Sequence, residues 1–277
     1  MENLEKTNKP KYQIHPTAVV APGAELSNGV KIGPYAIIGT HVTIGEGAEI
    51  GPHVVIDGKT TIGAKAHIFQ FASVGADPQD IKYKGELTSV EIGEGTIIRE
   101  FVTIHRGTDE GGGLTSIGKK CMIMAYSHIA HDCHIGNGVI MANGATLGGH
   151  VVIGNHVVMG GLTAVHQFCH IGDYAFLGAM SGTAKDIPPY VKFWGQRGKL
   201  YGLNKIGLRR HGFSREALKA LEKAYNILFK SNLLKAEAIK KAEQEVEQTP
   251  EVKNLLNFVK ESKRGIPIAS SKEDEQF

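Results

Sequence analysis

The sequence predicts a mainly β fold: a parallel β-helix of hexapeptide repeats followed by a small α-helical domain. Three observations predict the β-helix. An aliphatic residue recurs at every sixth position, the fifth residue of each block is usually small, as at Ala36 and Ala48, and glycine often follows the aliphatic residue, as in Ile32-Gly33. A period of six fits neither an α-helix nor a plain strand. Each block is therefore a short strand and a tight corner, and three blocks close one triangular coil.

The aliphatic positions fall into three phased runs. They extend from Ile14 to Val74, from Ile92 to Ile104 and from Ile117 to Leu177, and comprise 25 blocks in all. Burying that many aliphatic side chains, at roughly 1.5–3 kcal/mol each, supplies the core of a large domain. The repeated positions are therefore structural, and we expect the chemistry at residues outside them.

Two segments interrupt the repeat and are predicted to be excursion loops, 76–91 and 108–116. An unbroken phase through the first would bury Asp80 and Glu86 in the core, which is costly for unpaired carboxylates. The second carries three consecutive glycines and shifts the phase by one residue. Long loops on a rigid scaffold often carry binding residues, so both are candidate parts of a functional site.

The repeat ends at a double proline, which divides the chain into a β-helix over 1–190 and a helical domain over 191–277. Ser214 is expected to cap a helix whose apolar residues recur at helical spacing. A second helix should begin after Thr249, because proline suits the first helical position. The polar tail 270–277 is expected to be disordered.

Composition excludes several classes of protein. The net charge of only +3 argues against general nucleic-acid binding. With no run of 18 or more apolar residues and no recognisable signal peptide, the sequence predicts a soluble, cytoplasmic protein with no membrane insertion. Cys121, Cys133 and Cys169 all occupy small core positions, so we expect reduced core thiols and not a disulfide or a metal set.

One of the 13 histidines combines an imidazole with a carboxylate next to it in the sequence. His131 precedes Asp132, while His128 and His134 occupy another position of their blocks and should project elsewhere. An adjacent carboxylate can orient an imidazole and stabilise its protonated form, as a general base requires. The pair is therefore the candidate catalytic dyad.

Five motifs strengthen this hypothesis: IHRGT at 104–108, GGGLT at 111–115, HIAHDC at 128–133, TAVHQF at 163–168 and GFSRE at 212–216. In their order and spacing the chain resembles the acyl-[acyl-carrier-protein]–UDP-N-acetylglucosamine O-acyltransferases of lipid A biosynthesis, a hexapeptide-repeat family whose β-helix is left-handed. The resemblance implies transfer of an R-3-hydroxyacyl chain from acyl carrier protein to the glucosamine 3-hydroxyl of UDP-N-acetylglucosamine, the first step of that pathway.

The resemblance also implies roles for individual residues. His131 would be the general base, Asp132 its neighbour, and the Gly149 N–H the donor to the oxyanion. Phe176 and Ala179 would limit acyl-chain length. No metal or cofactor is implied, since the thioester is already activated. The implied substrate-binding residues are Asp80, Lys82, His105, His150, His166, Gln167, Asn204 and Arg210.

Two partners follow. A flat-sided prism lacks a concave pocket, so a homotrimer with sites between neighbouring prisms is expected. An acidic acyl carrier protein would dock on basic residues of the helical domain, namely Arg209, Arg210, Arg215 and Lys219.

The chain departs from the family pattern at Ile206, where the family has a glutamate near the nucleotide.

Three alternatives remain open at this stage. Another hexapeptide-repeat transferase would use acetyl-CoA and need no long acyl groove. A γ-type carbonic anhydrase is also a β-helix trimer, with zinc held by histidines of two subunits. A non-catalytic β-helix scaffold is the third, although the His131–Asp132 pair and the two loops count against it.

Overall fold

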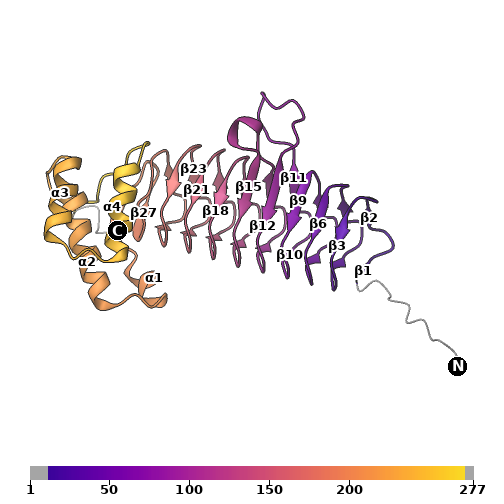
Figure 1. Cartoon of the computed structure of the whole chain (residues 1–277), viewed down its shortest axis with the longest axis horizontal. Helices are drawn as coiled ribbons and strands as arrows, with labels where there is room; N and C mark the ends of the chain where they lie inside the picture. The colour runs from indigo at the N-terminus through magenta and orange to yellow at the C-terminus, as the bar shows by residue number, and fades with distance from the viewer. Residues whose placement is uncertain (1–11, 272–277) are drawn as a thin grey trace.

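A computed structural model describes residues 12–271. It is an elongated prism of stacked coils with helices packed at its C-terminal end (Figure 1). Three sheets form the sides of the prism, and neighbouring strands within each side pair in parallel. The expected parallel β-helix is confirmed.

Strands of the three sheets alternate along the chain. The first sheet contains β1 (Gln13–Ile14), β4 (Lys31–Ile32), β7 (Glu49–Ile50), β10 (His67–Ile68), β13 (Ile97–Ile98), β16 (Met122–Ile123), β19 (Ile140–Met141), β22 (Val158–Met159), β25 (Phe176–Leu177), β27 (Val191–Trp194) and β28 (Lys199–Leu203). The second contains β2 (Val19–Val20), β5 (Ile37–Ile38), β8 (Val55–Ile56), β11 (Ser73–Ala76), β14 (Thr103–His105), β17 (His128–Ile129), β20 (Thr146–Leu147), β23 (Ala164–Val165) and β26 (Gly182–Thr183). The third contains β3 (Glu25–Leu26), β6 (Val42–Ile44), β9 (Lys59–Ile62), β12 (Ser89–Ile92), β15 (Leu114–Ile117), β18 (His134–Ile135), β21 (Val152–Ile153) and β24 (His170–Ile171).

The register stacks the aliphatic positions on one another. Ile38 pairs with Ile56 on the next coil, and Leu147 pairs with Val165. Their side chains are buried, as the period predicts. The exceptions are Ile14, at 37% exposed, and the partly buried Val20 and Leu26, because all three lie on the first described coil and have no coil packed above them. Cys121, Cys133 and Cys169 are buried free thiols, as expected.

The turns between sheets form three corners, which we name by their side chains. The aromatic corner joins the first sheet to the second and includes Tyr35, Phe71 and Tyr126. The histidine corner joins the second sheet to the third, at 130–133, 148–151, 166–169 and 184–186. The asparagine corner joins the third sheet to the first, at 136–139, 154–157 and 172–175.

Both excursion loops are shorter than the sequence predicts. β11 runs to Ala76 and β12 begins at Ser89, so the first loop is 77–88. The second is 106–113, with a short 3-10 helix, η1 (Asp109–Gly111), because residues from Leu114 onward form β15. β11, β12 and β15 extend into the predicted loops because their backbone groups pair with strands of the adjacent coils. Both loops rise from the same side of the prism (Figure 1).

The first sheet continues beyond the expected boundary at residue 190. β27 pairs in parallel with β25, and β28 turns back antiparallel to it. The cap predicted at Ser214 and the helix start predicted after Thr249 are confirmed: the Ser214 side chain accepts from the Ala217 N–H, and that of Thr249 accepts from the Val252 N–H. The helices are α1 (Lys205–Arg210), α2 (Arg215–Tyr225), α3 (Lys235–Glu245) and α4 (Pro250–Glu261), with a π-helical turn, η2 (Asn226–Lys230), after α2.

The end of the chain packs back onto the prism. The buried Asp186 carboxylate accepts hydrogen bonds from Ser262 Oγ at 2.7 Å and His170 N at 2.8 Å. Ser270, expected in a disordered tail, is buried instead and donates its N–H to Leu200 O. The rest of that prediction, over 272–277, lies outside the described residues. No described helix has the length and apolar character needed to cross a bilayer.

Candidate active site

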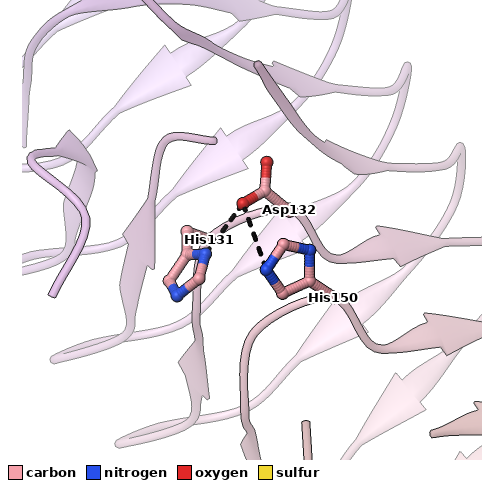
Figure 2. A group of neighbouring side chains, drawn as sticks. All are labelled: His131, Asp132 and His150. Atoms are coloured by element: carbon pink, nitrogen blue, oxygen red, sulfur yellow. Dashed lines mark hydrogen bonds and ion pairs between the residues drawn. The ribbon is translucent and has the colours of Figure 1, made fainter. Parts of the chain in front are cut away.

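The candidate site is centred on the histidine corner, where His131 and Asp132 form a hydrogen-bonded pair. His131 Nδ1 lies 2.8 Å from Asp132 Oδ2 (Figure 2). An ionised carboxylate only accepts hydrogen bonds, so Nδ1 carries the proton and Nε2 keeps its lone pair. Nε2 has no partner among residues 12–271. The arrangement therefore leaves one basic nitrogen available for proton transfer.

The second loop fixes the carboxylate. Thr108 donates its N–H to Asp132 Oδ1 at 2.9 Å and its hydroxyl to Oδ2 at 2.6 Å, and Asp132 is 2% exposed. Gly111 lies so close that a Cβ there would overlap the carboxyl group. The loop thus needs its glycine to close over Asp132, and the sequence alone assigned no role to Thr108.

His150 and Gly149 lie one coil below this pair. His150 Nε2 is 3.8 Å from Asp132 Oδ2, and its ring meets that of His131 edge-on at 5.0 Å (Figure 2). A Cβ on Gly149 would come within 2.7 Å of His131 Nε2, so the imidazole occupies the space a side chain would fill. The Gly149 N–H has no acceptor within the described part of the chain. A basic nitrogen and a free donor therefore lie on adjacent coils.

Two further histidines flank the pair. His105 is 8% exposed, and burial, then the neighbouring His128, lower its pKa to about 4. Burial, then His131, also lowers the pKa of His128, whose Nδ1 lies 2.7 Å from Thr103 Oγ1. Burial lowers the pKa of His150 as well. These rings are neutral at pH 7, so they add polar surface without positive charge.

The first loop supplies Asp80 and Lys82. Their segment meets the second loop, since Lys82 Nζ bonds to Glu110 Oε2 at 2.9 Å. Together the two loops line a cleft of about 300 Å³ that reaches Thr108, the residue holding Asp132. Arg106, whose role cannot be predicted from the sequence, secures the first loop by donating to the Tyr83 hydroxyl at 2.7 Å.

The donor set bears on the zinc alternative. Ligand atoms of His131, Asp132 and His150 lie within 4.8 Å of one another, the one such group among residues 12–271. However, Asp132 Oδ2 already accepts from Thr108 Oγ1 and His131 Nδ1. A metal bound to this oxygen would have to displace one of these hydrogen bonds. The cluster is therefore built as an oriented dyad, in contrast to the tetrahedral nitrogen set of a zinc site.

The other implied residues do not all meet at this site. His166 and Gln167 lie on the same corner one coil below Gly149. Asn204 lies against the asparagine corner, where its amide donates to Tyr174 O at 3.0 Å, and the exposed Arg210 ends the helix that Asn204 caps. Phe176 lies in the first sheet and Ala179 on the aromatic corner. Within one chain, the implied site residues therefore lie on different corners of the prism and do not form a single site.

Together, a prism of hexapeptide coils and an oriented histidine–carboxylate pair define a transferase of the hexapeptide-repeat class. Residues 23–58 and 114–149 match the model for bacterial transferase hexapeptide repeats, and residues 186–267 match that for domain 2 of UDP N-acetylglucosamine O-acyltransferase.

Relatives and solved structures agree. The acyl-[acyl-carrier-protein]–UDP-N-acetylglucosamine O-acyltransferase of Thermodesulfovibrio yellowstonii is 53% identical, and that of Myxococcus xanthus 51%, each over 92% of this chain and 98% of the relative. The UDP-N-acetylglucosamine O-acyltransferase structure from Moraxella catarrhalis superposes with a TM-score of 0.89 at 45% identity, covering 91% of this chain and 98% of that one. The Campylobacter jejuni enzyme gives 0.88 at 41%, covering 93% and 100%. The chain belongs to this acyltransferase family.

Proposed function

We propose that this enzyme transfers an R-3-hydroxyacyl chain from acyl carrier protein to the glucosamine 3-hydroxyl of UDP-N-acetylglucosamine, the first step of lipid A biosynthesis. The observation that carries the proposal is the His131–Asp132 pair, whose free Nε2 lies next to the unpaired N–H of Gly149. Membership of the family supplies the substrate classes.

The chemistry follows from the geometry. His131 Nε2 takes the proton of the sugar hydroxyl while Asp132 stabilises the resulting imidazolium. The hydroxyl oxygen then attacks the thioester carbon, and the charge on the former carbonyl oxygen is met by the Gly149 N–H. Collapse of this intermediate forms the ester, breaks the carbon–sulfur bond and expels the carrier thiolate, which recovers the proton from His131. No cofactor is needed in this cycle.

We propose a homotrimer whose sites lie between neighbouring prisms. Its support is the separation just described: Asn204 and Arg210 lie by the asparagine corner, whereas His131 lies on the histidine corner. A second chain brings the two corners together. The first loop also presents Ile81, which is fully exposed, and the aromatic corner bears a column of exposed rings. Apolar surface of this extent favours a protein partner.

We further propose that the carrier docks on the helical domain. Arg209, Arg210, Arg215 and Lys219 are exposed and have no ion pair with the described carboxylates. An acidic protein is attracted to such a patch, and the attraction weakens with salt. Reduced core thiols agree with a cytoplasmic site of action. Charge reversal at these positions should raise KM for the carrier, and insensitivity to both salt and reversal would exclude this face.

Acyl-chain length is proposed to depend on Phe176 and Ala179. The Ala179 methyl narrows the end of an acyl groove, so the preferred chain should be shorter than with glycine there. Each methylene that fits contributes about 0.8 kcal/mol. Ala179→Gly should therefore shift selectivity toward longer chains by roughly ten-fold per added pair of carbons. Unchanged chain-length profiles would show that the chain ends elsewhere.

The test of the function is direct. The purified protein is incubated with UDP-N-acetylglucosamine and a mixed pool of 3-hydroxyacyl carriers, and the products are analysed by mass spectrometry. We expect an ester at the 3-hydroxyl of the sugar. Transfer only from acetyl-CoA would favour the other hexapeptide transferases, and stoichiometric zinc with carbon dioxide hydration activity would favour the anhydrase.

A further inference from the structure

The buried Asp132 carboxylate lies close to two histidines, and its backbone does not decide between them. Asp132 Oδ2 lies 2.8 Å from His131 Nδ1 and 3.8 Å from His150 Nε2 (Figure 2). The Asp132 backbone is fixed, because its N–H donates to the buried Thr115 hydroxyl at 2.8 Å. The torsion that turns an aspartate carboxyl group is broad, however, so a fixed backbone does not fix the direction of Oδ2. Contacts from elsewhere in the chain must set that direction.

The two possible pairings differ in their consequence for proton transfer. With Oδ2 on His131 Nδ1, the ring proton stays on Nδ1 and the Nε2 lone pair is available. No other side chain among residues 12–271 forms a hydrogen bond with the His131 ring. If Oδ2 turned to His150, nothing would fix the tautomer of His131, and a ring protonated on Nε2 cannot accept a proton there. The partner of Asp132 therefore decides whether His131 is a base.

Thr108 contacts both oxygens of this carboxylate. Its N–H donates to Asp132 Oδ1 at 2.9 Å, and its hydroxyl donates to Oδ2 at 2.6 Å. The second distance is that of a short, charge-assisted hydrogen bond. Two donors from one residue, each on a different oxygen, fix the plane of the carboxylate as well as its position. The hydroxyl thus holds the oxygen that faces the histidines.

The second loop is built to hold Thr108 in this position. The Thr108 carbonyl accepts the Gly113 N–H at 2.8 Å, and its Oγ1 accepts the Gly111 N–H at 3.2 Å, which leaves the hydroxyl proton for Asp132. A Cβ on Gly107 would lie 2.8 Å from Asp132 Oδ1, and one on Gly111 would overlap the carboxyl group. Glycines on both sides of Thr108 therefore let the loop backbone approach the carboxylate.

We propose that Thr108 is a positioning residue of the transfer reaction: by holding the Asp132 carboxylate at both oxygens, it directs Oδ2 to His131 and away from His150. Thr108 thereby decides which histidine is the base. This inference rests on the proposed role of His131 in the reaction. His150, which stacks on Phe168 with 4.4 Å between ring centroids, then remains available for contact with substrate.

Serine and alanine at position 108 differ only in the hydroxyl, so this pair of variants tests the proposal. In Thr108→Ala, kcat should fall about 10- to 100-fold while KM for each substrate stays within about three-fold, because a misdirected base affects the chemical step and not binding. Thr108→Ser should keep kcat within about three-fold of the parent value. The control is Thr96→Ala, which removes another buried hydroxyl, one that donates to Gly118 O at 2.8 Å. It should lower the melting temperature and leave kcat unchanged.

A double-mutant cycle tests the choice between the two histidines. His150→Phe removes the competing nitrogen, and phenylalanine suits this left-handed position because Phe168 occupies the equivalent turn one coil further on, with a φ of 63°. In the His150→Phe background, Thr108→Ala should lower kcat by less than about three-fold, because the carboxylate has no second imidazole to face. The ratio of the two effects measures the coupling between Thr108 and His150.

Each outcome bears on a separate claim. A parental kcat in Thr108→Ala, or a serine variant as slow as the alanine variant, would overturn the proposal. An equal fall in kcat in both backgrounds would also overturn it, since Thr108 would then not act through the choice of histidine. A higher KM for UDP-N-acetylglucosamine with kcat unchanged would overturn it by assigning Thr108 to substrate binding.

Folding and the proposed function are checked separately. Thermal unfolding gives the folded fraction of each variant. If alanine reduces that fraction, Thr108→Val, which keeps the volume of the side chain and lacks the hydroxyl, repeats the comparison with the same expected fall in kcat. No transfer by the parent enzyme from the intact acyl carrier would contradict the proposed function, and this inference with it.

Discussion

Two corners of one prism share a backbone geometry and differ in what their side chains leave unsatisfied. His131 and Asn137 occupy the same turn position, two residues after a buried aliphatic residue, on the histidine and asparagine corners respectively. Residues one place further along have the same left-handed φ, near 57° at Asp132 and 64° at Gly138. The scaffold therefore does not distinguish a catalytic corner from a structural one.

On the asparagine corner the polar side chains satisfy the scaffold. Asn137 Oδ1 accepts the Lys119 N–H at 2.8 Å, Asn155 Oδ1 accepts the Asn137 N–H at 2.9 Å, and Asp173 Oδ1 accepts the Asn155 N–H. This ladder joins successive coils. On the histidine corner, His131 Nε2 and the Gly149 N–H have no such partner within residues 12–271. The groups proposed to act on the substrates are therefore those that make no hydrogen bond within the described part of the chain.

The largest expected effect separates the two corners. His131→Ala should lower kcat by roughly two to four orders of magnitude, the usual contribution of a positioned general base, with little change in melting temperature. Asn137→Ala should do the opposite, costing about 1 kcal/mol of stability with kcat preserved, since it removes the two ladder hydrogen bonds of an exposed side chain. Steady-state kinetics and thermal unfolding of both variants check this. A His131→Ala enzyme with near-normal turnover would refute its role as base.

Paired glycine substitutions give the next effect. An alanine Cβ at Gly149 would lie 2.6 Å from His131 Cε1, so the imidazole must shift, and kcat should fall about 100-fold. An alanine Cβ at Gly136 would instead lie 2.8 Å from the backbone nitrogen of Asn155, so we expect a loss of roughly 1–3 kcal/mol of stability. Denaturant unfolding and kcat are measured for both. If Gly149→Ala lost only stability, the two corners would not differ as described.

The third predicted effect is confined to acid pH and concerns stability. Burial lowers the pKa of His105 to about 4, so between about pH 6.5 and 4 the unfolded chain binds a proton that the folded chain excludes. Stability is therefore lost as pH falls through this range, by up to roughly 3 kcal/mol from this group. His105→Gln should reduce that loss. His156→Gln on the asparagine corner should reduce this loss of stability less. Burial is also the main cause that lowers the pKa of His156, but this side chain is only half-buried. Denaturant unfolding at several pH values measures both.

The fold was predictable because its core positions repeat. A buried aliphatic residue at every sixth position reports the same contact many times, so single irregularities such as Met141 do not obscure it. The cap at Ser214 and the helix start after Thr249 were equally predictable, since each depends on residues next to it in the sequence. By contrast α1 and α3 were missed, and β27 and β28 extend the sheet beyond the double proline, because their positions depend on packing against the last coils.

The site was predictable only in part. The His131–Asp132 pair is local, so sequence neighbours become bonded neighbours. Thr108 donates a hydrogen bond to the same carboxylate from a different coil, and the residues next to Thr108 in the sequence do not predict that contact. The same limit applies to Arg264, which reaches His166 from the far end of the chain. Contacts between distant segments depend on which residues of successive coils lie opposite one another, and the two excursion loops change that register.

The most direct test of the central claim, that the active site joins the histidine corner of one chain to the helical domain of another, is complementation. His131→Ala and Arg210→Ala subunits are each purified, then mixed, unfolded and refolded together, and assayed at a UDP-N-acetylglucosamine concentration below KM. In randomly mixed trimers about a quarter of the sites combine an intact His131 with an intact Arg210. We predict that activity recovers to about that fraction of the parent enzyme. Mixed trimers that remain as inactive as the separate variants would contradict the account.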